Sequence, residues 1–305
     1  MGGAAALKRL IGGLVLFLAL AVGGFAAAAE QPFRVYFIGN SITDVIHYAE
    51  LQKLAESRGH SMIWGRDMIP GAPLSWLWQH PKDGFQEVPF GLYPKALRDY
   101  SWNALSLEPF DRHLDGAEGD LAMAGNFIHL ALAKSPEVQV YIYSRWPRRD
   151  PGPGGKLVLD YPAKWLRPYT GRNDGSEESR DYFERLVHEL RKANPKMAHP
   201  VLLVPVGDVL LELDRRMKAG KVPGFTDIAQ VYADGIHFNN VGSYIVGVTY
   251  FATLFQEDPR GLTFEPYNTR RDPNKDRALN QPLAAVIQEV VWEVVRKHPL
   301  ATIRH

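Results

Sequence analysis

The sequence predicts an α/β protein, a three-layer α/β/α sandwich around a five-stranded parallel sheet. Five short runs rich in β-branched and aromatic residues alternate along the chain with longer segments of helical periodicity. Such an alternation covers both faces of a parallel sheet with helices, in a flavodoxin-like arrangement. Setting the N-terminal segment aside leaves about 275 residues, which suits a single domain. Residues 30–305 are expected to form that domain, since they contain no internal repeat.

The predicted elements follow one another in order. Strands are expected at residues 34–39, 60–64, 102–110, 138–144 and 200–206, and helices near 48–58, 119–133, 178–192, 208–218, 241–255 and 283–294. The helix after residue 240 has the strongest signal, because apolar side chains recur there every three or four positions. Residues 150–175 are rich in proline and glycine and are expected to form a long loop, acting as a lid or a subsite wall.

The first 29 residues have the three-part layout of a secretory signal peptide. Lys8 and Arg9 precede an apolar run over residues 10–22, and alanines follow at 26–29. We therefore expect a periplasmic or secreted protein with no stable membrane association after cleavage. An uncleaved anchor is the alternative, although the run is short for a membrane span.

Composition excludes several classes of protein. The chain has no cysteine, which excludes disulfides, thiolate metal sites and lipoprotein attachment. Its 35 basic and 34 acidic residues are mixed along the chain and give a net charge of +1. No basic surface for nucleic acid or for an anionic membrane follows from such a distribution. We therefore expect no nucleic-acid partner.

Ser41 lies in a Gly-Asn-Ser-Ile sequence where the first predicted strand passes into a helix. Open parallel sheets bind ligands at the carboxyl edge of their strands, so a hydroxyl at this turn is placed to meet a substrate. Serine is also a common helix N-cap, and capping alone would explain it. A second stretch favours chemistry. Asp234 and His237 lie three residues apart on a glycine-containing turn near the other end of the domain, so both can face one pocket.

Ser41, His237 and Asp234 supply the three parts of an acyl-transfer site. A serine hydroxyl is a weak nucleophile until an imidazole takes its proton, and the imidazole needs a third group to orient it. The α/β-hydrolases share this chain order but carry the nucleophile in Gly-x-Ser-x-Gly. Gly-Asn-Ser after the first strand, combined with Asp-x-x-His before a late helix, resembles the SGNH (GDSL-like) hydrolase superfamily. The resemblance implies an SGNH hydrolase fold and the roles of nucleophile, general base and orienting acid for Ser41, His237 and Asp234.

The resemblance also implies that the backbone N–H groups of Ser41 and Gly71 stabilise the oxyanion. Gly71 is equally explained by the Pro-Gly turn in which it lies. The third block of the family, Gly-x-Asn-Asp, is replaced by Glu-Pro-Phe-Asp from residue 108, so the usual asparagine is missing. The amide of Asn40 or Asn126 is a candidate replacement. Asn40 and Glu108 are also expected to contact the substrate.

Three larger side chains are candidates for binding the substrate. Trp76 follows the Gly71 loop and is expected to stack on a sugar ring, although tryptophans of this kind also occur in cores. Arg145 and Trp146 follow the fourth predicted strand, where one is placed for charged hydrogen bonds and the other for stacking. A surface salt bridge is the alternative for Arg145.

The sequence thus predicts an exported serine esterase that removes ester groups, above all O-acetyl groups, from a small-molecule or polysaccharide substrate. The scheme needs neither a metal ion nor an organic cofactor. One alternative is a carbohydrate-binding protein without turnover, suggested by the missing asparagine, and another is a lipase- or thioesterase-type acyl hydrolase. Metal-assisted hydrolysis through His47, His113 or His129 lacks the spacing of a metal-binding motif.

Overall fold

The computed structural model of the protein describes residues 31–269 and 276–302, so the predicted signal peptide lies outside the described residues. A six-stranded sheet runs in the order β3-β2-β1-β4-β5-β8. Its strands are β1 (Phe33–Gly39), β2 (Met62–Met68), β3 (Phe85–Gln86), β4 (Ala104–Leu107), β5 (Gln139–Tyr143) and β8 (Leu202–Val204). Neighbouring strands are parallel except for the edge strand β3, which pairs antiparallel with β2. The prediction of five strands missed β3, because two residues are too few for a periodic pattern.

The five parallel strands have the order of a flavodoxin-like sheet, as predicted. The chain goes outwards from β1 to β2 and then crosses to β4 on the other side of β1. Between β1 and β4 the direction of winding therefore reverses, and such a switch point is where open α/β sheets bind ligands. Ser41 follows β1 at this position.

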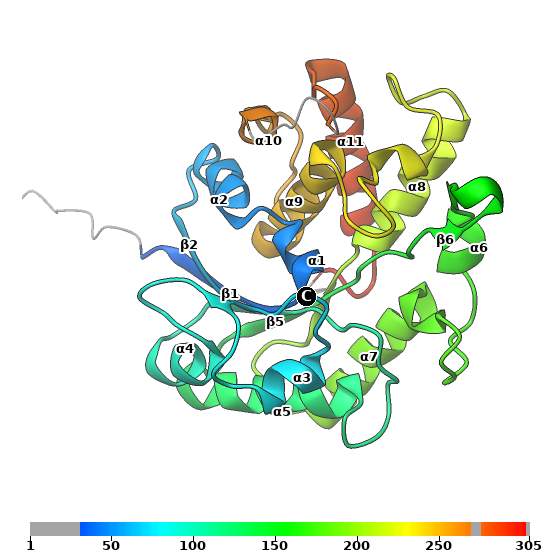
Figure 1. Ribbon diagram of the computed structural model, residues 1–305. Helices are drawn as coiled ribbons and strands as arrows, with labels where there is room; N and C mark the ends of the chain where they lie inside the picture. The colour runs from blue at the N-terminus through cyan, green and yellow to red at the C-terminus, as the bar shows by residue number, and fades with distance from the viewer. Residues whose placement is uncertain (1–30, 270–275, 303–305) are drawn as a thin grey trace, which may run out of the picture. The chain divides into compact units, whose positions relative to one another are not determined.

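Helices cover both faces of the sheet (Figure 1). One layer contains α2 (Tyr48–Glu56), α8 (Val206–Lys218), α9 (Asn240–Phe255) and α11 (Gln281–Val295). The opposite layer contains α3 (Leu74–Gln79), α4 (Tyr93–Asp99), α5 (Asp120–Lys134) and α7 (Arg180–Ala193). No helix in the described parts of the chain combines the length and the hydropathy of a membrane span.

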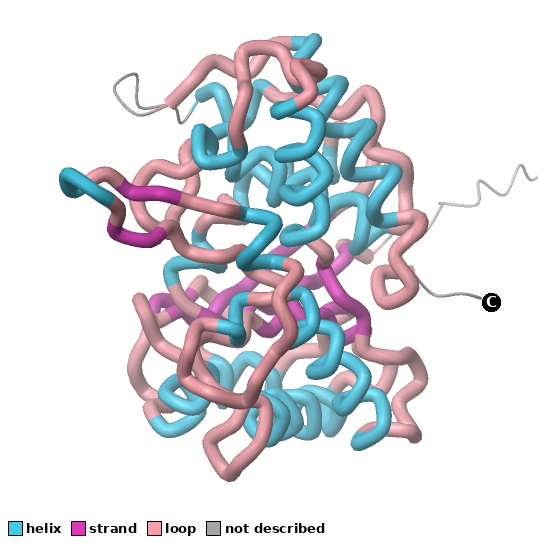
Figure 2. Tube along the Cα trace, turned by 90° about the vertical axis from the view of Figure 1, so that its right-hand side faces the viewer, coloured by secondary structure: helices cyan, strands magenta, loops and turns pink. Residues whose placement is uncertain are grey.

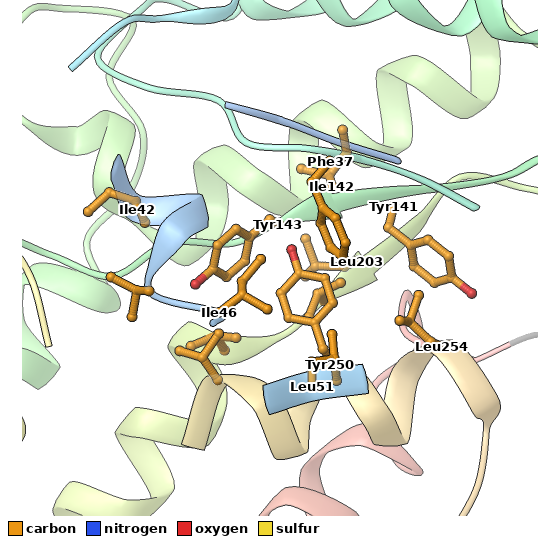
Figure 3. Close-up of a cluster of buried hydrophobic side chains, with 14 of the residues drawn as sticks. Phe37, Ile42, Ile46, Leu51, Tyr141, Ile142, Tyr143, Leu203, Tyr250 and Leu254 are labelled. Atoms are coloured by element: carbon orange, nitrogen blue, oxygen red, sulfur yellow. The ribbon is translucent and has the colours of Figure 1, made fainter. Parts of the chain in front are cut away.

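Helix α9 is the centre of the core on its side of the sheet (Figure 3). Every residue of α9 except the last is buried. The Tyr250 ring packs edge-on against Phe37 of β1 and Tyr143 of β5, with ring centroids 5.7 and 5.1 Å apart. A helix that is buried all round cannot shift without disturbing several neighbours. His237 lies on the turn before α9, so this turn leads directly into a rigid element.

Several short elements lie in segments where the sequence predicted loops. Residues 150–175 contain a two-stranded hairpin that is separate from the central sheet (Figure 2) and the helix α6 (Tyr161–Trp165). The hairpin strands are β6 (Asp150–Pro151) and β7 (Leu157–Val158), joined by the 3-10 turn η1 (Pro153–Gly155). The prediction of a continuous loop was therefore wrong. Other short elements are η2 (Ser176–Glu178), η3 (Ile228–Val231) and α10 (Glu265–Thr269), whereas α1 (Ser41–Asp44) lies where the sequence predicted the start of a helix.

Asp67 is a buried carboxyl near the end of β2, and burial raises its pKa to about 7. One carboxylate oxygen accepts the Tyr93 N–H at 2.9 Å, whereas the other has no hydrogen-bond partner among the described groups. Because the pKa of Asp67 is higher in the folded chain than its ordinary value of 3.8, the folded state holds the extra proton between these two pH values. The free energy of unfolding should therefore fall as the pH rises from about 4 to about 7.

We expect Asp67→Asn to remove this pH dependence. At pH 8 the variant should be more stable than the wild type by about 1 to 3 kcal/mol, because it avoids a buried carboxylate that lacks one partner. Near pH 4 the two proteins should be equally stable. Urea unfolding at both pH values measures the difference. A variant that is less stable than the wild type at pH 8 would show that the charged form of Asp67 is the favoured one.

Candidate active site

Ser41 is the first residue of α1, directly after β1. The N-cap of this helix is Asn40, whose side-chain oxygen accepts the Ile42 N–H at 2.9 Å, so the cap is not Ser41. The amide of Asn40 also donates to the Ala72 carbonyl at 3.2 Å, and the residue is fully buried. Both ends of this amide are therefore used inside the protein, which contradicts its expected contact with substrate. The Ser41 hydroxyl is left free of a capping role.

The turn between β1 and α1 requires a glycine at position 39. A Cβ atom there would lie 2.7 Å from the Thr43 methyl group and 2.8 Å from the Glu108 Cβ. Real Cβ atoms do not come so close to other carbon atoms, so any larger residue would move the turn. The close packing of Gly39 thus fixes the backbone that presents Ser41.

Asp234 and His237 lie on a tight turn between η3 and α9. The turn is closed by the Ala233 N–H, which donates to the His237 carbonyl at 2.9 Å, and by a bridge between Tyr232 and Phe238. One oxygen of Asp234 accepts the backbone N–H groups of Ile236 and His237 at 2.8 and 2.7 Å. These bonds orient the carboxylate towards the side chain of His237.

The three predicted catalytic side chains lie in one hydrogen-bonded chain. The Nε2 atom of His237 is 2.9 Å from the Ser41 Oγ, and its Nδ1 atom is 2.9 Å from the second oxygen of Asp234. The Ser41 and His237 side chains come from positions 196 residues apart. The side chains of His237 and Asp234 are 39% and 57% exposed, so solvent and small substrates reach this end of the site.

The charge of Asp234 determines the tautomer of His237. Burial alone would raise the pKa of Asp234, but the two backbone N–H groups and the imidazole outweigh it and hold the pKa below its ordinary value. An ionised carboxylate only accepts hydrogen bonds, so Nδ1 of His237 must carry the proton. Nε2 is then the acceptor, and the Ser41 hydroxyl donates to it. This is the arrangement that a general base requires.

Gly71 lies in the loop between β2 and α3, and this loop is joined to the Ser41 turn. The Ile69 N–H donates to the Gly39 carbonyl at 3.2 Å, and the Ala72 carbonyl accepts a hydrogen bond from the Asn40 side-chain amide. Gly71 has a φ of +68°, which favours glycine, so the Pro-Gly turn is present as well. Among the described residues its N–H donates to no other group, and the Ser41 N–H, at the start of a helix, has no partner within it.

Glu108 and Arg145, both expected to touch the substrate, are instead buried. The Glu108 carboxyl group accepts a hydrogen bond from the Asn40 N–H at 3.4 Å, next to Ser41. Burial raises the pKa of Glu108 well above its ordinary value. Arg145 pairs with Glu178 at 2.9 Å and Asp111 at 2.6 Å. The alternative of a surface salt bridge for Arg145 is wrong, because its side chain is 1% exposed.

The two tryptophans differ in their surroundings. Trp76 is 47% exposed and stacks on His80 with ring centroids 3.8 Å apart, so one face of the indole is covered. Trp146 is fully buried, and its Nε1–H donates to the Ile236 carbonyl at 2.7 Å. The expected stacking of Trp146 on substrate is therefore contradicted, whereas the expectation for Trp76 remains a prediction.

Asn126 lies away from the Ser41 turn. It belongs to α5, beside a cavity of about 320 Å³ that is also lined by Leu114, His129 and Asn194. None of Ser41, Gly71, Asp234 and His237 lines this cavity, so Asn126 does not face the Ser41 turn. The expected role of Asn126 as an oxyanion donor is therefore contradicted. From the sequence alone, the Gly125-Asn126 pair reads as a loop motif, but it lies inside helix α5.

The three histidines of the metal alternative lie in separate elements. His47 precedes α2, His113 follows β4 and lies 3.5 Å from Glu177, and His129 belongs to α5. Within the described parts of the chain, no group of three or more His, Asp or Glu side chains is arranged to hold a metal ion. Arg149 was not among the predicted site residues, yet its backbone N–H donates to the Gly235 carbonyl at 2.8 Å. No signal in the sequence pairs these two distant positions.

Comparisons with known proteins bear on the fold. No family model matches the sequence, and no curated protein matches it. Among solved structures, a DUF4886 family protein from Bacteroides uniformis is similar over 89% of this chain and 98% of its own, with a TM-score of 0.58 and 17% identity. A family 3 carbohydrate esterase from Clostridium thermocellum is similar over 79% of this chain and 100% of its own, with a TM-score of 0.43 and 10% identity. At such low identities a likeness shows a fold, here the mostly parallel sheet flanked by helices.

Proposed function

We propose that this chain is a serine esterase of the SGNH type, exported and acting on ester groups of a carbohydrate, with O-acetyl groups as the preferred class. The observation that carries the proposal is the hydrogen-bonded chain from the Ser41 Oγ through His237 to Asp234. It stands at the switch point of the sheet, where open α/β folds bind their ligands. A protein that only binds a ligand does not need this hydrogen-bonded arrangement of serine, histidine and aspartate.

The reaction follows from the placement of the protons. The Ser41 oxygen attacks the ester carbonyl while His237 takes its proton at Nε2, and the carboxylate of Asp234 stabilises the imidazolium that forms. The N–H groups of Ser41 and Gly71 stabilise the oxyanion of the tetrahedral intermediate. The imidazolium then gives its proton to the leaving alcohol. Water, activated by His237, releases the acid and restores Ser41.

Two features support a carbohydrate ester over a long-chain lipid. Trp76 offers an exposed indole in α3, directly after the Gly71 loop, and an indole face suits a sugar ring. The acid and base side chains are exposed to solvent, so a polar substrate reaches them. Export, inferred from the residues before position 30, would bring the protein to polysaccharides outside the cytoplasm.

The proposal is tested by trapping the wild-type protein with a fluorophosphonate and mapping the adduct by mass spectrometry. We expect a single adduct on Ser41, because among the described residues it is the hydroxyl that is hydrogen-bonded to His237. Ser57 serves as an internal control, since its hydroxyl donates to the Leu54 carbonyl. The absence of an adduct at Ser41 would contradict the esterase proposal.

Glu108 gives a specific reason to keep the second candidate, a carbohydrate-binding protein without turnover. The family has an asparagine amide at the third block, whereas this chain has Phe110 at that position and, two residues earlier, the buried Glu108, which accepts a hydrogen bond from the Asn40 N–H. The oxyanion would then be stabilised by two donors, and the loss of one donor costs about 10²- to 10³-fold in turnover. Binding of an oligosaccharide by a protein that shows no reaction with the fluorophosphonate would favour this candidate.

A further inference from the structure

The tip of the turn that carries Asp234 and His237 faces solvent. Both catalytic side chains are exposed, and the hydrogen bonds of Asp234 hold the turn internally without fixing its distance from Ser41. The height of the imidazole above the Ser41 hydroxyl must therefore be set by whatever anchors the turn to the sheet.

The anchor is the segment that leaves β5. The Nε1–H of Trp146 donates to the Ile236 carbonyl at 2.7 Å, and the indole stacks on Phe238 with ring centroids 3.7 Å apart and planes 15° apart. These two contacts fall on the residues directly before and after His237. The Trp146 side chain is fully buried and packs on Tyr143 of β5, so it moves with the sheet.

Two further bonds join the same segments. The Tyr232 hydroxyl donates to the Pro147 carbonyl at 2.9 Å, and the Arg149 N–H donates to the Gly235 carbonyl at 2.8 Å. Helix α9 also packs on Phe238, because a Cβ at Gly242 would lie 2.6 Å from it. The phenyl ring thus contacts both a buried indole and a buried helix.

We propose that Trp146 is a positioning residue for the acid–base pair, acting through Ile236 and Phe238 to hold His237 at hydrogen-bond distance from Ser41. This inference rests on the proposed esterase function. Trp146 has no exposed surface and contacts no substrate, so its effect must pass through the turn. Displacement of a catalytic group by about 1 Å can cost about 10²-fold in rate.

Trp146→Phe is the variant that isolates the N–H group. It keeps an aromatic face against Phe238 but removes the bond to the Ile236 carbonyl. With p-nitrophenyl acetate as substrate, we expect kcat to fall about 10- to 100-fold and KM to change less than about twofold. Phe238→Leu is the complementary variant, which keeps the N–H bond and removes the stacking, and it should lower kcat in the same way.

Trp165→Phe is the matched control. Trp165 is also fully buried, and its Nε1–H donates to Asp208 at 3.2 Å. Trp165 lies in α6 and Asp208 in α8, so neither residue belongs to the turn. The two Trp→Phe variants should lower Tm by comparable amounts, about 2 to 6 °C. Only the variant at position 146 should lower kcat per active site, with active sites counted by fluorophosphonate titration.

The outcomes separate the two proposals. Equal kcat values for wild type and Trp146→Phe would overturn the positioning role while leaving the esterase function intact. A fall of kcat in Trp165→Phe as large as that in Trp146→Phe would show a general loss of stability and would also overturn the positioning role. A wild-type protein that hydrolyses p-nitrophenyl acetate no faster than Ser41→Ala would remove the esterase function, and the inference with it.

Discussion

Ser41→Ala is expected to lower kcat for p-nitrophenyl acetate by about 10⁴- to 10⁶-fold, with KM little changed. The alanine removes the oxygen that lies 2.9 Å from the Nε2 of His237, and no neighbouring group replaces the covalent step. His237→Ala should cause a loss of the same size, since the hydroxyl then has no base. The double variant should be no slower than either single variant, because both residues act in one step.

The controls for this prediction are an exposed histidine and a serine outside the site. His199→Ala and Ser57→Ala should each keep kcat within about twofold of the wild type, because both residues lie at surface positions of other elements. Circular dichroism and Tm should be unchanged in all of the variants. An active Ser41→Ala protein would contradict the nucleophile assignment whatever the state of His237.

Local chemistry explains why the sequence could place Ser41, Asp234 and His237, whose catalytic roles stay a prediction. A strand that ends in Gly-Asn-Ser places Ser41 at the sheet edge, and the Asp-x-x-His spacing closes a turn through bonds from the Ile236 and His237 N–H groups to Asp234. Helix α9 was predicted from its periodicity because a long buried helix repeats its apolar side chains many times.

The parts that the sequence could not predict depend on contacts between distant segments. Arg145 and Trp146 follow β5 and were expected to face the substrate, yet both are buried. The partners that bury them, Glu178 and Ile236, lie 33 and 90 residues further along the chain. Position at the end of a strand does not say whether a side chain turns towards the pocket or under a neighbouring loop. The helix α3 was missed because fewer than two helical turns show no period, and the strand β3 was missed because two residues are too few for an alternating pattern.

Arg145 stands at the centre of a buried ion network, which makes it the position where a single substitution should cost the most stability. Its guanidinium pairs with Glu178 and Asp111, and Arg148 pairs with the same two carboxylates. Burial would raise the pKa of Glu178, but the two guanidinium groups outweigh it and lower the pKa to about 2. Since the ordinary value is 4.5, Glu178 stabilises the fold above that pH, and this stability is lost as the pH falls towards 2.

Arg145→Met should therefore destabilise the protein by about 3 to 5 kcal/mol at pH 7, because it fills much of the space but leaves a buried carboxylate with one cation fewer. Arg98→Met is the control, since the Arg98 side chain is 69% exposed and its pair with Asp99 should contribute less than about 0.5 kcal/mol. Urea unfolding with an unchanged m-value measures both. The cost of Arg145→Met should shrink below pH 4.5, as Glu178 of the variant takes up a proton. A cost that stays the same from pH 7 to pH 3 would instead indicate lost packing against Phe110, over which the guanidinium lies at 4.6 Å.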